Sequence, residues 1–532
     1  MLREDKFFET EDMNKIWQRY CGFLDISMKE FMEIQRYLLL EQIALIADST
    51  LGKKIMNGQK PKTVEKFRQV IPLTTYEDYT PYLSDKDEDA LAIKPYCWIH
   101  TSGTGGNPKW VPMSDRAAEL GWRRNSLAFM ILCAARSKGD VRLHPGARMV
   151  VHAPPRPYGS AEGIYDLSDY FTLRTMPPMS EADGMTFPEK IGKSFKMAMR
   201  DGTDFVCSTS AVLVRMGEGF SQRGSKTKFS FSMLHPAVLF RFSKAILHSK
   251  MQRRPMLPKD LWQIKGILCW GTDTSIYRDK IIHYWGQTPY EFYVFSEGGI
   301  AAIQSWNKKG MIFCPDLVFL EFIPEEEWLK SRADKEYQPA TVLFDEVEAG
   351  KLYELVLTSF HGMPFLRYRI GDLVRFDSIG DKETGITLPQ MTFAGRSNNV
   401  IDVHGIARLD EKIVWQAIVN TGIDFEDWAM RKEVDKEEPV IRLYIEPKQE
   451  VNSEQFRHRL HKELEAIEPY YHEMATNLKV NPIRVKALPK GTFQRYLATK
   501  AQEKAMMAQL KPSHMNASDE VINKLIQLSK EV

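Results

Sequence analysis

The sequence predicts an α/β fold with mainly parallel sheets flanked by helices, because apolar strand-like runs alternate with helical stretches along most of the chain. Four such runs, at residues 147–153, 204–210, 267–270 and 290–295, each lead into a polar loop. Continuous apolar runs are typical of strands buried on both faces, and the helices between them provide the crossovers that parallel pairing needs. The chain has 532 residues, too many for one ordinary core, so we expect at least two domains.

The first 113 residues are expected to be helical and then to turn into strands. Phe31, Ile34, Leu38 and Leu45 recur at helical spacing within residues 8–60, which predicts a packing face rather than a membrane helix. Residues 110–113 read as a short strand, and residues 115–135 read as a helix. The loop that precedes this short strand is therefore expected to connect two strands.

Composition argues against several classes of protein. Hydrophobic residues make up 43% of the chain and charged residues 27%, as in ordinary soluble globular proteins. The 72 basic and 70 acidic residues leave a formal net charge of +2, which argues against a nucleic-acid binder driven by bulk charge. The six cysteines are scattered without a C-x-x-C pair, so neither a zinc site nor a disulfide framework is expected, and a reducing compartment fits.

No targeting or membrane segment is expected from the sequence. The N-terminus lacks the apolar core of a signal peptide, and the longest apolar zone, residues 37–47, is interrupted by Glu41 and Gln42. That zone is too short to span a bilayer. We therefore expect a cytoplasmic protein without a membrane span.

The glycine-rich loop of residues 100–110 is the most informative stretch of the chain. Glycines allow backbone N–H groups to turn inward and form an anion nest, while hydroxyl groups and a lysine add further donors. The donors and glycines of this loop suit a polyphosphate; they are Ser102, Gly103, Thr104, Gly105 and Lys109. Pro108 precedes the lysine and a strand follows it, so the loop is not a Walker motif, and a plain surface loop is the alternative.

Three further polar clusters follow strand-like runs. Tyr293 offers a flat face to a base, Ser296 a donor to a phosphate, and Glu297 an oxygen ligand to Mg²⁺. Asp372 can accept hydrogen bonds from both hydroxyls of a ribose, and the guanidinium of Arg396 can reach ribose or phosphate. Each residue alone has a structural alternative, as a surface acid, a turn former or a salt-bridge partner. Their order and placement together favour a nucleotide site.

The chain changes character after residue 350. Short strands are predicted at 352–358 and 368–375, followed by a plausible hinge at 393–400. Beyond the hinge we expect a small α+β module, with helices and strands in sequence order at 410–420, 439–447, 453–467, 482–488 and, mostly helical, 492–532. The predicted domains are a large N-terminal ATP- and acyl-binding domain, residues 1–395, and a small mobile C-terminal domain, residues 396–532.

This order of motifs resembles the adenylate-forming superfamily, which includes acyl-CoA synthetases, adenylation domains and luciferases. Within it the chain is most similar to the Gretchen Hagen Three acyl acid–amido synthetases of plants and their bacterial relatives. The segments that carry the resemblance span nearly the whole chain; they are residues 67–74 with Tyr76, 101–109, 296–298, 368–372, 395–396, 489–493 and 509–512.

The resemblance implies a ligase that uses ATP and Mg²⁺. A carboxylic acid would be converted to an acyl-adenylate with release of pyrophosphate, and a nucleophile would then displace AMP. Ser102, Thr104 and Lys109 would hold the phosphates, Ser296 the α-phosphate, Glu297 the Mg²⁺ and Asp372 the ribose, while Tyr293 would stack on adenine. Gly271, Thr272 and Asp273 would stand in the adenine-pocket loop, although the usual glycine pair is absent.

The C-terminal part departs from the superfamily pattern. The Ser-Gly-Lys motif that carries an adenylation lysine is missing, so Lys511 is the candidate for that role and Lys490 the second choice; a surface lysine is the alternative for either. The acidic hinge residue of acyl-CoA synthetases is replaced around Ser397, which weakens the case for thioester formation.

Three functions remain open from the sequence. The leading one transfers the acyl group to an amine, expected to be an amino acid. The second transfers it to CoA, and the third is a non-catalytic adenylate-binding regulatory protein. An apolar or aromatic acid is expected beside residues 153–163 and 207–210, with Trp122, Phe129 and Met130 as possible apolar wall. No residue identifies the acid.

Overall fold

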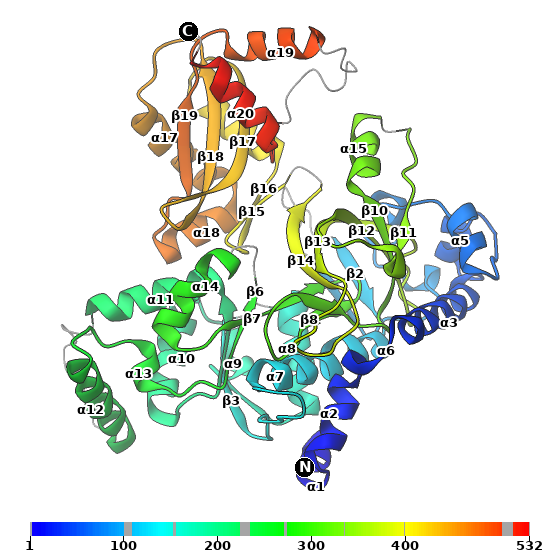
Figure 1. Cartoon of the computed structure of the whole chain (residues 1–532), viewed down its shortest axis with the longest axis vertical. Coiled ribbons are helices and arrows are strands. Elements are labelled where there is room, and N and C mark those ends of the chain that lie inside the picture. The colour runs from blue at the N-terminus through cyan, green and yellow to red at the C-terminus, as the bar shows by residue number, and fades with distance from the viewer. Residues whose placement is uncertain are drawn as a thin grey trace.

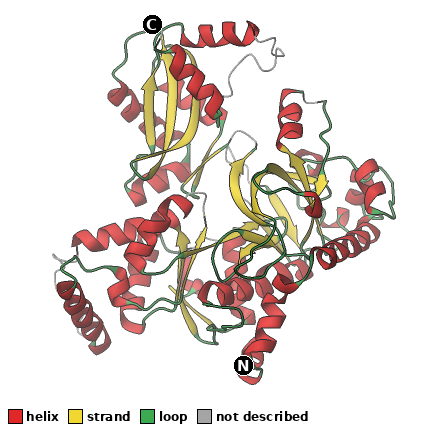
Figure 2. Cartoon of the chain, in the orientation of Figure 1, coloured by secondary structure: helices red, strands yellow, loops and turns green. Residues whose placement is uncertain are grey.

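The computed structural model describes residues 3–100, 109–152, 156–223, 235–270, 274–334, 336–397, 400–502 and 514–530. Helices surround one large sheet, and a smaller sheet lies in the C-terminal part, so the predicted α/β class is confirmed (Figure 1; Figure 2). Among the helices in these ranges, none is both long and apolar enough to cross a bilayer.

The large sheet has twelve strands, and its first half is parallel. The parallel strands stand in the order β4-β3-β5-β6-β7. Their bounds are β3 (Ala147–Val151), β4 (Leu173–Met176), β5 (Phe205–Thr209), β6 (Gly266–Trp270) and β7 (Pro289–Phe295). The main crossover helices are α8 (Gly159–Tyr170), α10 (Phe187–Asp201), α11 (Ser210–Arg223) and α14 (Thr274–Trp285). All four strands predicted from apolar runs are therefore present.

The second half of the same sheet is antiparallel. It continues from β7 in the order β8-β9-β14-β13-β12-β10-β11. The bounds are β8 (Gly299–Gln304), β9 (Met311–Phe313), β10 (Val318–Pro324), β11 (Val342–Leu343), β12 (Leu352–Ser359), β13 (Tyr368–Ser378) and β14 (Gln390–Arg396). Because β7 pairs parallel with β6 and antiparallel with β8, the direction of pairing changes at β7.

The chain begins with five helices, of which α3 packs on β10 in the antiparallel half. They are α1 (Arg3–Thr10), α2 (Met13–Cys21), α3 (Met28–Ile46), α4 (Thr50–Ile55) and α5 (Val64–Val70), as the helical spacing predicts. A capping box between Ser27 and Glu30 begins α3. Two buried amides fix this helix to the rest, since Gln35 Nε2 donates to Val318 O (2.8 Å) and Gln42 Nε2 donates to Met363 O (2.7 Å).

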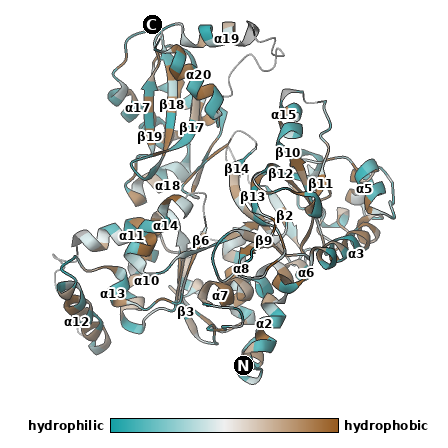
Figure 3. Ribbon diagram, in the orientation of Figure 1, coloured by the Kyte–Doolittle hydropathy of each residue, from teal (hydrophilic) through white to brown (hydrophobic). Residues whose placement is uncertain are grey.

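Two short strands flank the glycine-rich loop, as predicted. β1 (Cys97–His100) and β2 (Trp110–Met113) pair antiparallel, with His100 opposite Trp110. The predicted helix that follows is built from three pieces: α6 (Asp115–Ala118), the π-helical segment η5 (Glu119–Arg124) and α7 (Asn125–Ala134). Every residue of α7 is buried, and the helix is almost entirely hydrophobic in Figure 3.

The C-terminal part forms a separate three-stranded sheet. Its elements are β15 (Ile401–Val403), β16 (Ala407–Leu409), α16 (Glu411–Asn420), β17 (Phe425–Asp435), β18 (Glu438–Pro447), α17 (Ser453–Ile467), α18 (Pro469–Leu478), β19 (Ile483–Ala487), α19 (Thr492–Gln502) and α20 (Asp519–Leu528). The predicted helices and strands are present, with Asn452 capping α17, and β15, β16, β17 and α18 are additional. In the described ranges no strand after Arg396 joins the large sheet. The division at residue 395 stays a prediction.

Candidate active site

Polar side chains gather at the carboxyl ends of the parallel strands, where α/β folds bind ligands. His152 follows β3, Thr209 ends β5, and Ser296 and Glu297 form the turn between β7 and β8. This edge of the sheet is also the place where the pairing changes from parallel to antiparallel.

A very close approach of two backbones holds the Glu297 turn. A methyl group at Gly121 of η5 would lie 2.7 Å from the carbonyl oxygen of Gly298, so only glycine fits there. Gly299 has a φ of +75°, and Ser359 Oγ donates to Glu297 O (2.6 Å). The π-helical turn is therefore packed directly against the loop that carries Glu297, which fixes the position of its backbone.

The carboxyl group of Glu297 is 3% exposed and lies among charged neighbours. Burial raises its pKa, while the positive charges of Lys109 and Arg396 lower it. A buried carboxylate that is only partly compensated gains stability from a bound cation. The residue fits the predicted Mg²⁺ role, since Mg²⁺ is commonly held by one or two carboxylates together with substrate phosphates. The described residues contain no cluster of three His, Cys, Asp or Glu side chains suited to a metal ion.

Asp372 is the centre of a second buried group. Tyr293 donates its hydroxyl hydrogen to Asp372 Oδ2 (2.6 Å), and Arg396 Nε lies 2.9 Å from Asp372 Oδ1. Asp372 on β13 and Arg396 on β14 are paired in register, so the sheet itself brings them together. Within the described part of the chain Oδ1 receives no well-aligned hydrogen bond, which leaves it able to accept one from a ligand hydroxyl.

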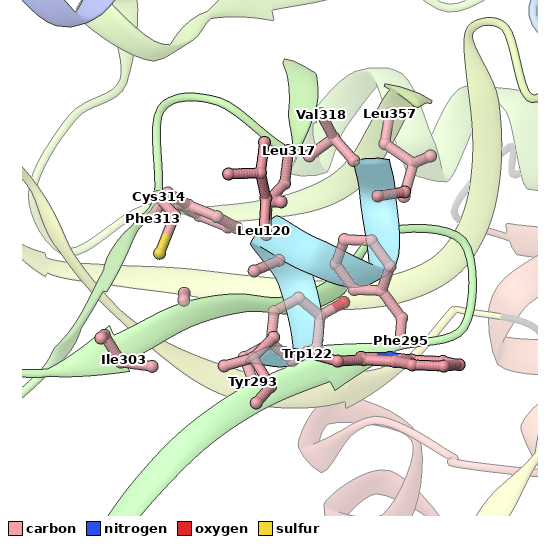
Figure 4. Close-up of a cluster of buried hydrophobic side chains, with 14 of the residues drawn as sticks. Leu120, Trp122, Tyr293, Phe295, Ile303, Phe313, Cys314, Leu317, Val318 and Leu357 are labelled. Atoms are coloured by element: carbon pink, nitrogen blue, oxygen red, sulfur yellow. The ribbon is translucent and has the colours of Figure 1, made fainter. Parts of the chain in front are cut away.

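The ring of Tyr293 packs among other aromatic side chains. The centroid of Phe295 lies 5.3 Å away, and that of Phe393 lies 6.0 Å away. Figure 4 shows Tyr293 and Phe295 of β7 beside Trp122 of η5. The residue is 6% exposed, and burial together with Asp372 raises the pKa of its hydroxyl. The hydroxyl group of Tyr293 is bonded directly to Asp372, the residue predicted to hold the ribose. The stacking of the tyrosine ring on adenine stays a prediction.

Lys109 stands at the exit of the glycine-rich loop. Its Nζ lies 5.2 Å from the centre of the Tyr76 ring, in a cation–π contact. Tyr76 accepts a hydrogen bond from Trp110 N (2.8 Å) and donates one to Trp110 O (2.9 Å), which ties the first residue of β2 to the loop before β1. The remaining predicted phosphate and adenine contacts lie outside the described residues; they are Ser102, Gly103, Thr104, Gly105, Gly271 and Thr272.

The C-terminal part contributes an arginine that the sequence patterns did not single out. Arg408 on β16 interacts electrostatically with Asp372, Glu297 and Arg396. Burial and the charge of Arg396 lower its pKa, whereas the carboxylates raise it. The β15–β16 hairpin therefore faces the predicted nucleotide site. No local motif marks Arg408, because its relation to the site arises only from the packing of the two parts.

Of the two candidate adenylation lysines, only Lys490 lies within the described residues. Lys490 is exposed and lies two residues before α19. In Figure 1, α19 lies at the end of the C-terminal part that is far from β7 and β13. Lys511 lies outside the described residues. The catalytic role of either lysine stays a prediction.

A cavity of about 470 Å³ opens between the parallel half of the sheet and the C-terminal part. The large-sheet side supplies residues from the strand ends, α8 and α10, namely His152, Tyr158, Ser160, Asp183, Met185, Thr186, Lys190, Ser208, Thr209, Val212 and Trp270. The C-terminal side supplies Gly405, Ile406, Tyr470, Glu473, Met474, Asn477 and Leu478. A hydrogen bond between the hydroxyl groups of Tyr158 and Tyr470 joins the two sides.

This cavity lies where the sequence predicts the acid. It borders residues 156–163 and the end of β5, and a methyl group at Gly159 would lie 3.6 Å from Ser296 Oγ. Trp122, Phe129 and Met130 do not line it. Phe129 instead stacks on Phe292 at 4.9 Å, inside the core.

His152 is a neutral polar group in the cavity wall. Its Nδ1 lies 3.2 Å from Ser208 Oγ and its Nε2 lies 3.1 Å from Ser194 Oγ. Burial, with the nearby charge of Lys190, lowers the pKa of the imidazole to about 4. The ring is therefore uncharged at neutral pH and acts as a hydrogen-bonding group rather than as a cation.

The sequence of this chain matches the models of three domains of one protein family. The GH3 family N-terminal domain matches residues 22–142, the GH3 family central domain matches residues 311–396, and the GH3 family C-terminal domain matches residues 411–520. Together these segments span more than half of the chain, and they include Lys109, Asp372, Arg396 and Glu473. The chain belongs to the GH3 family. The family predicted from the motifs is confirmed.

Individual relatives of this GH3 chain are distant. Jasmonoyl–L-amino acid synthetase JAR4 of Nicotiana attenuata is 24% identical over 390 residues, which cover 64% of each chain. The match thus spans less than two thirds of that relative. Indole-3-acetic acid-amido synthetase GH3.2 of Arabidopsis thaliana is 28% identical over 118 residues, 22% of this chain and 20% of the relative.

One solved structure supports the fold of the GH3 chain. A 2-hydroxyisobutyryl-CoA ligase, solved with 2-HIB-AMP and CoA, superimposes with a TM-score of 0.54 at 14% sequence identity. The match covers 89% of this chain and 86% of the ligase. The chain therefore shares the overall fold of this ligase.

Proposed function

We propose that this GH3-family chain is an ATP-dependent, AMP-forming ligase that activates a carboxylic acid as an acyl-adenylate and transfers the acyl group to an amine, an amino acid in the first instance. One observation carries the proposal: the fold brings Lys109, Asp372 and Arg396 into electrostatic range of the buried Glu297, and it pairs Arg396 with Asp372. The names of two relatives, a jasmonoyl–L-amino acid synthetase and an indole-3-acetic acid-amido synthetase, agree with it.

In the first step, an oxygen of the acid carboxylate attacks the α-phosphorus of ATP, and the bond from that phosphorus to the bridging oxygen breaks as pyrophosphate leaves. The reactants are both anions, so the site must supply positive charge. Lys109 provides it at the phosphate loop, and Glu297 would hold Mg²⁺, which when bound neutralises phosphate charge. Asp372, oriented by Tyr293 and Arg396, would hold the ribose hydroxyls.

In the second step, the lone pair of the acceptor nitrogen attacks the acyl carbon. The bond between that carbon and the phosphate oxygen breaks, AMP leaves with the bonding electrons, and the nitrogen loses one proton to give the amide. Arg408, brought to the site by β16, provides positive charge near Asp372 and Glu297. We assign it the stabilisation of the leaving phosphate.

The apolar share of the cavity supports an apolar or aromatic acid. Tyr158, Trp270 and Ile406 line it, and the wall at Gly159 reaches Ser296. Aromatic and aliphatic walls with a few polar groups are typical of small-molecule sites.

A product assay tests the proposed function. The enzyme is incubated with ATP, Mg²⁺ and a panel of aromatic and aliphatic acids, with either the twenty amino acids or CoA as acceptor, and products are identified by mass spectrometry. Amide formation without CoA supports the proposal. Product that forms only when CoA is present would assign the chain as a thioester-forming ligase instead, and tight ATP binding without any product would favour a regulatory protein.

A further inference from the structure

The helix α12 (Pro236–Met251) presents an exposed apolar face that neither the nucleotide site nor the cavity uses. Its other face packs against α10 and α13 (Pro258–Leu261), and Val238, Ala245 and Ser249 are buried there. Figure 1 shows the helix at the edge of the molecule, away from the C-terminal part. Five large apolar side chains of the helix are exposed; they are Leu239, Phe240, Ile246, Leu247 and Met251.

These exposed side chains form one stripe along the helix. Phe240, Leu247 and Met251 follow one another at intervals of seven and four residues, which places them on the same side of an α-helix. Leu239 and Ile246, also seven residues apart, widen the stripe. Phe240 and Met251 are each 72% exposed, and Leu247 is 63% exposed. Single exposed leucines need no explanation, whereas a row of large apolar groups on one helix face is typical of an interaction surface.

The charged side chains of this helix and its C-terminal flank are all basic. Residues 236–254 contain two lysines, three arginines and one histidine, but no aspartate or glutamate. Lys244 stands within the apolar stripe and Lys250 borders it; both are exposed, and neither forms an ion pair with any of the described residues. Arg254, in contrast, is paired with Asp260 of α13. The face therefore suits a partner that is both apolar and negatively charged.

A second copy of this chain does not meet that requirement. A symmetric pair of α12 helices would bring the same patch of each protomer together, so the lysines of one copy would face those of the other. The face is also the convex side of a single helix at the edge of the molecule, a shape that fits a flat surface. An anionic lipid bilayer is such a surface, because apolar side chains can enter it below the headgroups while lysines reach the negative charges above.

We propose that α12 attaches the protein to an anionic membrane surface, with Phe240, Leu247 and Met251 inserted below the headgroups and Lys244 and Lys250 on the lipid phosphates. The helix lies flat on the bilayer and does not span it. This attachment does not depend on the proposed ligase activity, because it uses residues outside the nucleotide site and the cavity.

Sedimentation with lipid vesicles tests the attachment. The full chain is mixed with vesicles of phosphatidylcholine alone or of phosphatidylcholine with about 30% phosphatidylserine, and the bound fraction is measured at low and at high salt. We expect binding to the anionic vesicles to be at least about tenfold tighter than to the neutral ones, and to weaken as the salt concentration rises. Equal binding to both kinds of vesicle, or binding to neither, would overturn the proposal.

A double substitution locates the attachment on α12. Phe240→Ser with Leu247→Ser removes apolar area from the stripe and should weaken binding to the anionic vesicles at least about tenfold. The matched control is Tyr37→Ser with Leu45→Ser, which replaces an exposed aromatic residue and an exposed leucine on α3. All four side chains are exposed, so both variants should keep the parental midpoint in urea. Parental binding in the α12 variant, or an equal loss in the control, would remove the attachment from this helix.

The charge is tested by Lys244→Gln with Lys250→Gln, which keeps the apolar stripe. Binding to neutral vesicles should not change, while the preference for anionic vesicles should fall at least about fivefold. An unchanged preference would contradict the role of the lysines. A dimer in analytical ultracentrifugation that Phe240→Ser with Leu247→Ser dissociates would assign the face to a second copy instead. Retention on immobilised polyglutamate without any binding to vesicles would assign it to an acidic protein.

Discussion

At the scale of single residues, the site depends on two buried carboxylates, Glu297 and Asp372, whose burial lowers the stability of the folded chain. Glu297 and Asp372 are 3% exposed each, and within the described residues Asp372 Oδ1 receives no hydrogen bond. Such residues are rare in cores unless they bind something. Their burial is the physical reason to treat them as ligands of a nucleotide and its metal rather than as surface acids.

Asp372→Asn tests the ribose assignment. The substitution keeps the shape but removes the charge that Arg396 faces at 2.9 Å, and it weakens acceptance of two ribose hydroxyls. We expect ATP affinity, measured by calorimetry, to fall at least tenfold while the affinity for the acid changes little. Asp377→Asn, exposed on the same strand, is the control. Equal ATP affinity in parent and Asp372→Asn would remove Asp372 from the nucleotide site.

Glu297→Gln should separate stability from activity. Burial raises the folded-state pKa of Glu297 above its unfolded value, so its contribution to stability is present below about pH 4.3 and is lost as pH rises through the folded pKa. Without Mg²⁺ and ATP, the variant should therefore be more stable than the parent at pH 7, by about 1.4 kcal/mol for each pKa unit of that elevation, in urea unfolding.

The same variant should lose acid-dependent pyrophosphate exchange by a factor of at least about 100, since it cannot hold the metal ion. A variant with parental exchange, or one that is less stable than the parent at pH 7, would contradict the role given to the buried charge.

Several residues of the candidate site were predictable from the sequence, and others were not. Glu297 follows β7, Arg396 ends β14, and Lys109 and Asp372 stand in short sequence motifs, so their patterns could be read locally. Arg408, Lys190 and Glu473 could not, because a lysine on a helix gives no sign of facing a cavity until α10 and α18 are packed together. The Tyr293–Asp372 hydrogen bond is likewise a contact between distant segments.

At the scale of elements, one glycine-dependent contact and one buried ion pair hold the site in place. The close contact between Gly121 of η5 and Gly298 of the β7–β8 turn fixes the backbone that carries Glu297. Arg367, at the start of β13, donates to both oxygens of Glu321 at 3.0 and 2.9 Å and to the carbonyl oxygen of Ile71 (2.8 Å). That network joins the N-terminal helices to β10 and β13.

Gly121→Ala should damage the site through packing alone. The added methyl group would meet the Gly298 carbonyl at 2.7 Å, so the turn carrying Glu297 must shift. Overpacking of this kind costs about 1–3 kcal/mol. We expect a lower midpoint in urea and a lower kcat for adenylation. Gly184→Ala, where a methyl group meets nothing within 4 Å, is the control, and parental activity in Gly121→Ala would refute the positioning role.

Arg367→Met should destabilise the chain far more than it changes chemistry. It leaves the carboxylate of Glu321, 1% exposed, with only Arg68 as a charged partner. Breaking a buried ion pair by removing one member costs about 3–5 kcal/mol. Denaturant unfolding measures the loss, and the double variant Arg367→Met with Glu321→Met should recover most of it. A loss below about 1 kcal/mol would show that the network is not a structural anchor.

Helices and strands were predicted correctly where a single sequence feature, an apolar run or a capping residue, marked them. Continuous apolar runs marked β3, β5, β6 and β7, and capping residues marked α3 and α17. The strands from β8 to β11 and from β15 to β17 were missed, since antiparallel strands rely on neighbours rather than on a run of their own. The short parallel strand β4 was missed as well. The π-helical turn in the predicted helix was also missed, because it is set by the glycine contact across to the β7–β8 turn.

At the scale of the whole molecule, the sheet is one continuous structure of twelve strands rather than a parallel sheet with a separate small β region. Its change of direction at β7 places Glu297, the proposed metal ligand, close to Asp372, the proposed ribose ligand, and to the cavity. The C-terminal part adds Arg408 to the nucleotide site and Glu473 to the cavity. Sequence patterns predicted the two parts in order along the chain, but they contain no information on how the parts pack.

Acid-dependent exchange of labelled pyrophosphate into ATP tests the central claim most directly, because it reports adenylation without any acceptor. The account predicts exchange that requires both Mg²⁺ and an aromatic or aliphatic carboxylic acid, and that falls at least about 100-fold in Lys109→Ala, with Lys94→Ala as a control on a surface lysine. Exchange that is absent with every acid tested, or that is unchanged in Lys109→Ala, would contradict it.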